Sequence, residues 1–190
     1  MRIAISGTAC QGKSTLVKDF LEQWPSYKTP EKTYRNIIEE NNLTHSSKTN
    51  KSTQRKILDF MIEEQQKYRT DDNVIFDRCP LDNLVYSMWS CEQPDSDIDE
   101  DFVNSCIPLV RESYRNLDII FFVPITKVAP IGIVEDGVRD TDQRVIEEVD
   151  NIFKAVHRDH EKNPKTNLFV VDDKPPIIEV FGTRRERIEI

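Results

Sequence analysis

The sequence predicts an α/β fold with a doubly wound, mostly parallel five-stranded sheet and helices on both faces. Short apolar runs rich in β-branched residues recur along the chain, and amphipathic helical patterns separate them. The stronger runs are almost continuously apolar, as expected of parallel strands that are buried on both faces. A length of 190 residues suits one core, so we expect residues 1–190 to form a single domain.

The pattern of each segment predicts its structure in chain order. The expected strands are residues 2–6, 27–29, 74–76, 119–123 and 168–171, of which 27–29 is the weakest. Helices are expected at 14–21, 31–40, 54–69, 81–89, 102–114 and 142–160. Proline removes a backbone donor, so the fifth of these helices is expected to bend or restart at Pro108. Thr183 and Glu186 have the spacing of a capping box, which predicts a short final helix.

Two polar segments are interpreted as loops. Residues 41–53 are rich in Ser, Thr, Asn and Lys, and we expect a flap on the substrate side. Residues 92–101 carry six acidic side chains, which indicates a solvated acidic connector.

Residues Gly7 to Ser14 read GTACQGKS, a complete Walker A signature between an expected strand and an expected helix. The glycines allow close approach of the backbone, whose N–H groups would bind a phosphate at the helix N-terminus. Lys13 would reach the β- and γ-phosphates of ATP, and the Ser14 hydroxyl would ligate Mg²⁺. The expected nucleotide-binding residues here are Gly7, Thr8, Ala9, Cys10, Gln11, Gly12, Lys13, Ser14 and Thr15.

Asp77 and Arg78 follow directly after the apolar strand 74–76. An acid in this position is typical of a Walker B element, which holds Mg²⁺ while the metal bridges the β- and γ-phosphates. Arg78 would bind a phosphate or a substrate oxygen in a bidentate manner. The alternative is that Asp77 only caps the helix that begins near Pro80.

Residues 132–144 form the next candidate feature. Glycines flank this segment, and Arg139 and Arg144 stand five residues apart at the start of the longest expected helix. The pattern predicts a lid whose two arginines neutralise the charge of the transferring phosphoryl group. The alternative is that both arginines lie on the surface and pair with neighbouring acids.

Two further segments are assigned by their place after strands. Glu31 would accept a proton from an attacking hydroxyl if the strand before it neighbours the first strand. It would otherwise open the helix 31–40, and the choice between Glu31 and Asp77 as general base stays open. Gly182 and Thr183 follow the last strand and are expected at the adenine. The arginines 184, 185 and 187 could equally form a solvated basic face.

Composition limits the possible partners. The net charge is −8 and the sequence pI about 5.0, whereas proteins that bind long nucleic acids are usually basic, so a small substrate is favoured. No apolar run is long enough to span a membrane and no signal peptide is visible, so we expect a cytoplasmic protein. The four cysteines lack metal spacing and the three histidines stand among polar residues. We therefore expect reduced thiols and exposed histidines.

Together these segments resemble the P-loop nucleoside and nucleotide kinases, and among them the nicotinamide-riboside-kinase-like AAA group. The resemblance rests on GTACQGKSTL at 7–16, TPExxYR at 29–35, VIFDRCPLDNLVY at 74–86, DGVRDxDxR at 136–144 and FGTRRERI at 181–188. It implies Glu31 near the acceptor hydroxyl, Asp77 near the metal, and Arg139 and Arg144 in the lid. It also implies substrate contacts by Tyr34, Arg35 and Asp82.

The resemblance implies a kinase that uses ATP and Mg²⁺ to phosphorylate a hydroxyl or phosphate of a nucleoside-type acceptor. Some virus-encoded relatives are thought to phosphorylate modified pyrimidines in DNA. A kinase of 5-hydroxymethyluracil within DNA is therefore one alternative, with Lys48, Lys51, Arg55 and Lys56 as candidate contacts. A regulatory P-loop ATPase is the other. Nothing resembles the nicotinate-mononucleotide adenylyltransferase domain that often precedes such a kinase, so a dual enzyme is not expected.

Overall fold

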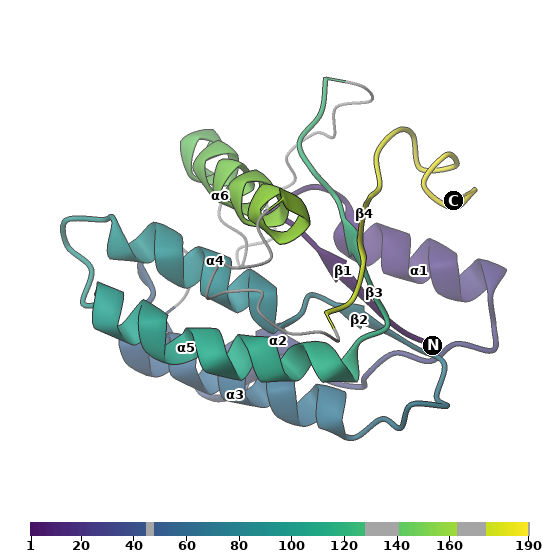
Figure 1. Cartoon of the computed structure of the whole chain (residues 1–190), viewed down its shortest axis with the longest axis horizontal. Coiled ribbons are helices and arrows are strands. Elements are labelled where there is room, and N and C mark those ends of the chain that lie inside the picture. Colours follow the sequence, from purple (N-terminus) through teal and green to yellow (C-terminus); the bar gives the residue numbers. More distant parts are fainter. Residues whose placement is uncertain (45–47, 128–140, 163–173, 190) are drawn as a thin grey trace.

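Four parallel strands form one sheet in the computed structural model, which describes residues 1–44, 48–127, 141–162 and 174–189 (Figure 1). The strands are β1 (Arg2–Ser6), β2 (Val74–Asp77), β3 (Ile119–Phe122) and β4 (Ile177–Glu179), in the order β2-β1-β3-β4. Ile5 pairs with Asp77, and Ser6 pairs with Phe122. The carboxyl ends of the three longer strands therefore meet at one edge, where ligands bind in open α/β sheets.

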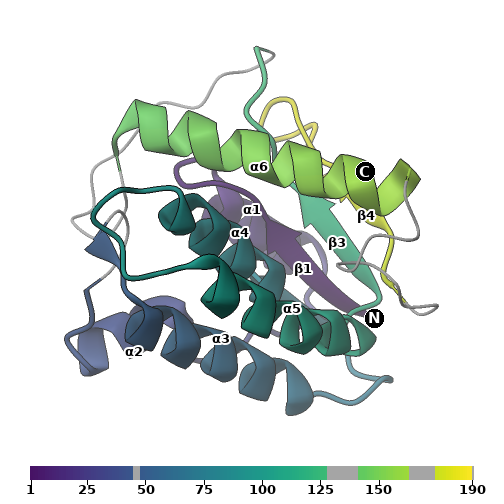
Figure 2. The same cartoon turned by 60° about the vertical axis from the view of Figure 1, so that its left-hand side comes forward.

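Each face of the sheet has its own apolar core. The described helices are α1 (Lys13–Gln23), α2 (Tyr34–Glu40), α3 (Lys51–Gln66), α4 (Pro80–Cys91), α5 (Glu100–Ser113) and α6 (Gln143–Lys162), with a short 3₁₀ turn, η2 (Tyr114–Asn116). Ile3 and Ile5 face α1, whereas Ala4 faces the core beneath α4, α5 and α6. Figure 2 shows these three helices in front of the sheet and α1 behind it. The predicted α/β class with helices on both faces is confirmed.

The prediction of five strands is wrong for the described residues. Residues 27–29 contribute a single bridge, between Lys28 and Val74, because this run is short, polar and followed by Pro30. The strand expected at 168–171 lies outside the described residues. β4 was not predicted, since this strand is only three residues long and begins directly after the two prolines at 175 and 176.

Several local predictions also need correction. α5 runs without a break through Pro108, which is exposed, so water can bond the carbonyl that the proline leaves without a partner. α2 begins at Tyr34 with Thr33 as its N-cap, so Glu31 does not open this helix. His157 is buried and meets the Phe122 ring edge-on, because it lies one turn after Phe153 on the buried stripe of α6.

The described parts of the two expected loops contain more structure than their composition suggests. α3 begins at Lys51, so the first loop is shorter than predicted. In the second, Asp97 accepts a hydrogen bond from the Lys51 backbone, and Asp99 pairs with the Lys51 ammonium. Asp99 also caps α5 by accepting from the Phe102 N–H at 2.9 Å. The interpretation of 92–101 as a merely solvated connector is therefore wrong for these two acids.

Within the described ranges, no helix combines the length and the apolar character needed to cross a membrane. The four cysteines are free thiols, and three of them are buried.

We expect Gly7→Ala to lower the free energy of unfolding by about 3 kcal/mol, because two penalties coincide there. Gly7 has φ 137°, and a Cβ on it would lie 2.6 Å from the carbonyl oxygen of Val123. Gly182→Ala is the matched control, since Gly182 also has a positive φ, of 102°, but its Cβ would meet the Glu186 side chain and no backbone atom. Urea unfolding of both variants measures the difference, and equal losses would contradict the steric argument.

Candidate active site

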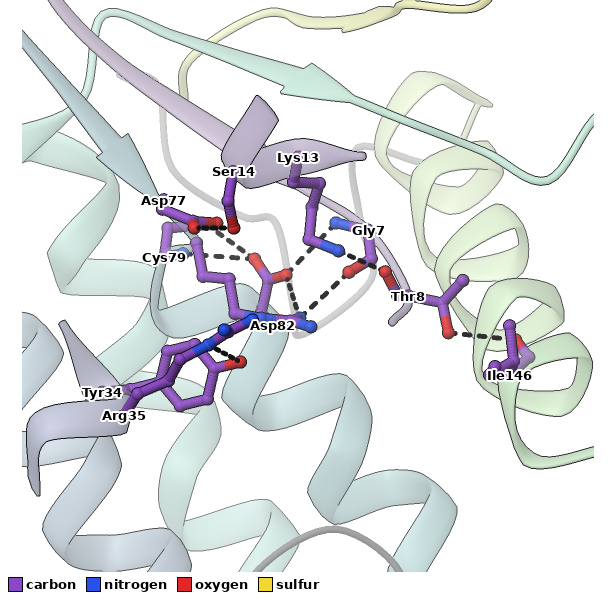
Figure 3. Close-up of polar contacts among 11 residues, drawn as sticks. Gly7, Thr8, Lys13, Ser14, Tyr34, Arg35, Asp77, Cys79, Asp82 and Ile146 are labelled. Atoms are coloured by element: carbon purple, nitrogen blue, oxygen red, sulfur yellow. Dashed lines mark hydrogen bonds and ion pairs between the residues drawn. The ribbon is translucent and has the colours of Figure 1, made fainter. Parts of the chain in front are cut away.

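The Walker A segment joins the end of β1 to the start of α1 (Figure 3). Gly7, Cys10 and Gly12 all have positive φ, of 137°, 59° and 75°, and Gly12 is the N-cap of α1. A loop of this kind directs successive backbone N–H groups toward one point, and the helix N-terminus adds partial positive charge. The buried Lys13 ammonium lies back across the loop and donates to the Thr8 carbonyl. The segment therefore has the form of a phosphate-binding loop.

Two of the residues expected at the metal come together. The Ser14 hydroxyl on α1 donates to Asp77 Oδ2 at the end of β2, at 2.5 Å. A hydroxyl and a carboxylate are hard oxygen ligands of the kind that Mg²⁺ accepts, with phosphate oxygens and waters supplying the rest. No cluster of three or more His, Cys, Asp or Glu side chains suited to a metal occurs in the described part of the chain. These two residues fit a magnesium that arrives with a nucleotide.

Asp82 links the ends of two strands to the start of α4. Its Oδ1 accepts from the Gly7 N–H at 3.1 Å and from Arg78 Nη1 at 2.9 Å, and its Oδ2 accepts from the Cys79 N–H at 3.1 Å. The carboxylate is 1% exposed. Both carboxylate oxygens of Asp82 already have partners inside the protein. The geometry therefore favours a role for Asp82 in holding Arg78 and the phosphate loop over a direct contact with the substrate.

Arg78 occupies the centre of the site in a strained conformation, with φ 81°. Its guanidinium also donates to the Gly7 carbonyl at 3.0 Å and lies 5.3 Å from the ring centres of both Tyr34 and Tyr86. Burial by itself would lower the pKa of Arg78, but the interactions with the two tyrosines, Asp82 and Asp77 raise it overall. The site therefore keeps a fixed positive charge beside the phosphate loop.

A cleft of about 890 Å³, including its open mouth, extends from the phosphate loop between α2, α3 and α4. Its apolar wall consists of Ile38, Ile57 and Met61. Residues 9–15 form one end, and the polar lining toward the helices consists of Tyr34, Arg35, Thr49, Gln54, Asp77, Arg78, Asp82, Asn83 and Tyr86. All three expected substrate contacts, Tyr34, Arg35 and Asp82, line this cleft.

Gln54 and Asn83 are cleft residues that the sequence analysis missed. Asn83 Nδ2 donates to the backbone carbonyl and to the side-chain oxygen of Gln54, and Gln54 Nε2 donates to Thr49 Oγ1 at 3.1 Å. Asn83 Oδ1 is buried and has no hydrogen-bond partner within the described ranges. Since the Gln54 carbonyl requires the amide nitrogen, the orientation of the Asn83 side chain is determined. Asn83 lies within the quoted 74–86 motif, whereas nothing in the sequence distinguishes Gln54.

Other predicted site residues lie outside the cleft lining. Glu31 is exposed, although Thr29, Pro30, Lys32 and Thr33 border a second cavity that Asp77 and Arg78 also line. The Arg144 side chain is 79% exposed, and its Nε donates to Glu148 at 2.7 Å, as in the alternative interpretation. Arg139 and the rest of the expected lid up to residue 140 lie outside the described residues.

Two of the four basic residues considered as DNA contacts interact with other side chains of the protein. Lys51 pairs with Asp99, and Arg55 donates to Ser105 at 2.7 Å and lies over the Phe102 ring. Lys48 and Lys56 are exposed.

The C-terminal segment meets the phosphate loop through one arginine. Gly182 is buried and Thr183 is exposed, and neither lines the cleft. Thr183 and Glu186 make the two bonds of the expected capping box, but a single turn follows in place of a helix. Arg187 is 7% exposed and donates to the Gln11 carbonyl at 2.7 Å, so the alternative that placed it on a solvated face is wrong.

Comparison with known proteins gives a family and a fold. A family model described as an AAA domain matches residues 2–175. A structure of deoxyadenosine kinase from M. mycoides with dCMP and dCDP bound has a TM-score of 0.69 and 19% identity, over 100% of this chain and 95% of that one. No curated protein matches the sequence.

The NadR protein is a second structural relative. Its complex with NR has a TM-score of 0.67 and 15% identity, over 97% of this chain. Its complex with NAD and AMP-PNP has a TM-score of 0.60 and 13% identity, over the whole of this chain. The chain spans about half the length of NadR, 48% and 49% in the two structures. At sequence identities this low, the structural similarity to both proteins establishes the fold alone.

Proposed function

The chain belongs to the AAA domain family, a P-loop family of the nucleoside kinase type, and from this membership we propose an ATP- and Mg²⁺-dependent kinase. The acceptor is a hydroxyl or phosphate of a nucleoside-type molecule. The observation that carries the proposal is a continuous cleft. Its one end is the phosphate loop, and its other end has an apolar wall and polar groups. A nucleotide and an acceptor can thus lie end to end, and positioning supplies much of the catalysis in phosphoryl transfer.

The nucleotide end is formed by the phosphate loop. Backbone N–H groups of residues 9–14 bind the phosphates, and Lys13 transfers its hydrogen bond from the Thr8 carbonyl to a phosphate oxygen. Ser14 and Asp77 would hold Mg²⁺, which neutralises charge on the phosphate oxygens when it is bound. Gly182 and Thr183 are proposed at the adenine, and Arg139 and Arg144 in the lid.

The acceptor end contains the groups that distinguish a nucleoside. Ile38, Ile57 and Met61 offer an apolar wall to the faces of a base. The buried Asn83 Oδ1 requires an N–H donor, since a buried acceptor without a partner costs about 1–3 kcal/mol. A nucleobase supplies both the flat apolar face and the N–H group, which supports a nucleoside over a simple sugar or alcohol.

The remaining polar groups act on the acceptor hydroxyl. The Arg78 guanidinium, supported by Asp82, orients the hydroxyl or the phosphate beside it. Tyr34 and Arg35 complete this wall of the cleft. Asp77 is bonded to Ser14 and is proposed at the metal, so we assign the general base to Glu31, whose neighbours border the cavity below Asp77.

Incubation with γ-labelled ATP, Mg²⁺ and two acceptor pools tests the proposal. One pool holds free nucleosides and nucleotides, and the other holds DNA with 5-hydroxymethyluracil. We expect label on a member of the first pool. Label on the DNA would establish the alternative kinase, and release of label to water alone would establish an ATPase. The bonds of Lys51 and Arg55 within the protein count against the DNA pool.

We expect Asn83→Ala to raise the acceptor KM about 10- to 100-fold, which corresponds to one lost buried hydrogen bond. The KM for ATP should change less than about twofold, because Asn83 lies at the acceptor end of the cleft. Asn104→Ala on the exposed side of α5 is the matched control. Steady-state kinetics with each substrate varied in turn measures both constants. An equal rise in both KM values would contradict base recognition by Asn83.

A further inference from the structure

The C-terminal segment, residues 181–189, packs against α1 beside the phosphate loop. Figure 1 shows this segment next to α1. Ile188 contacts the apolar cluster that includes Leu16 and Phe20, and Arg184 forms an ion pair with Asp19. Residues more than 150 positions apart in the chain are thus held together at the helix that follows the Walker A motif.

Arg187 differs from the two other arginines of this segment. Arg184 pairs with Asp19 and Arg185 pairs with Glu189, but no carboxylate within the described ranges forms an ion pair with Arg187. Burial lowers the pKa of Arg187, yet an arginine remains charged at neutral pH. A buried cation without a countercharge is costly, so a nearby anion would be bound favourably.

The two bonds of Arg187 join the phosphate loop to the expected adenine contact. Nη1 donates to the Gln11 carbonyl at 2.7 Å, and Nε donates to the Gly182 carbonyl at 3.0 Å. The peptide between Gln11 and Gly12 is planar and trans, so its N–H is directed away from its carbonyl oxygen. With that oxygen held by Arg187, the Gly12 N–H is directed to the opposite side of this peptide, where it would be available to the proposed phosphate.

We propose that Arg187 is a positioning residue for the nucleotide: it fixes the Gln11–Gly12 peptide in its phosphate-binding orientation and couples the C-terminal segment to the bound triphosphate. The inference rests on the proposed use of ATP. It predicts that the loop loses affinity for phosphate when Arg187 is shortened, although Arg187 itself touches no phosphate. It also predicts that a bound nucleotide stabilises residues 181–189, because coupling between two sites is reciprocal.

Calorimetric titration with AMP-PNP and Mg²⁺ tests the first consequence. Arg187→Gln should weaken AMP-PNP binding about 10- to 50-fold, within the range of a lost charged hydrogen bond. Arg187→Lys, which keeps the charge, should lose less. Arg185→Gln is the matched control, since its exposed side chain lies in the same segment. A folded Arg187→Gln protein with wild-type affinity for AMP-PNP would overturn the proposal.

Hydrogen exchange of the wild-type protein tests the second consequence without any variant. Backbone amides of residues 181–189 should exchange at least about threefold more slowly with AMP-PNP bound. Unchanged exchange in this segment, with protection confined to the phosphate loop, would overturn the coupling. If the wild-type protein does not bind AMP-PNP at all, the proposed kinase itself fails. If it binds and Arg187 has no effect, only the role of Arg187 fails.

Discussion

Lys13→Ala is expected to lower kcat by about 10³-fold or more while the protein remains folded. Lys13 is the side chain of the Walker A motif that we propose carries positive charge to the β- and γ-phosphates. The cation is needed mainly when charge develops on the transferring group, so the loss should fall on kcat more than on the acceptor KM. Initial rates of transfer from γ-labelled ATP measure the effect, and circular dichroism checks the fold.

Lys18→Ala is the matched control for this variant. Lys18 lies on the same helix, but its side chain is 71% exposed, and among the described residues it forms an ion pair with Glu22 alone. Removing a surface ion pair of this kind changes stability by less than about 1 kcal/mol and should leave kcat unchanged. If Lys13→Ala transfers phosphate at nearly the wild-type rate, the assignment of residues 7–14 as the phosphate loop is wrong.

Asp77→Asn is expected to reduce kcat about 100-fold and to raise the Mg²⁺ concentration needed for half-maximal activity. Asparagine has the same shape and can still accept from Ser14, so the change removes mainly the charge that a cation requires. Rates measured over a Mg²⁺ titration separate this effect from a general loss of activity.

Two companion variants make the role of Asp77 specific. Asp72→Asn is the control, since Asp72 lies two residues before β2 and pairs with Lys28. It should leave the Mg²⁺ response unchanged. Glu31→Gln should lower kcat without shifting the Mg²⁺ response, as expected of a general base. A normal Mg²⁺ response in Asp77→Asn would contradict the proposed metal contact.

Predictions from the sequence succeeded where the determining interactions are local. The apolar run 74–76 followed by an acid predicts β2 and places Asp77, which the structure brings to the Ser14 hydroxyl. Both residues belong to short motifs in which strand, turn and helix signals follow one another in the chain. The parallel sheet follows from the alternation of strands and helices in the same way.

Residues that depend on distant partners could not be predicted. Arg187 has a local context like that of the exposed Arg185, and only its burial and its bonds to the Gln11 and Gly182 carbonyls distinguish the two. Gln54 and Asn83 lie on different helices, so no spacing in the chain indicates that they meet in the cleft. Residues 27–29 form one bridge where a strand was expected, since tertiary context overrides a weak β pattern.

The direct measurement of the central claim is the stoichiometry of the products. Phosphorus NMR of one mixture of enzyme, ATP, Mg²⁺ and a free nucleoside or nucleotide identified from the acceptor pools reports ADP and phosphorylated acceptor together. The proposed kinase predicts that both appear in a 1:1 ratio and that omitting the acceptor nearly stops ADP formation. ADP and inorganic phosphate formed at the same rate with and without acceptor would contradict it, and would identify a P-loop ATPase.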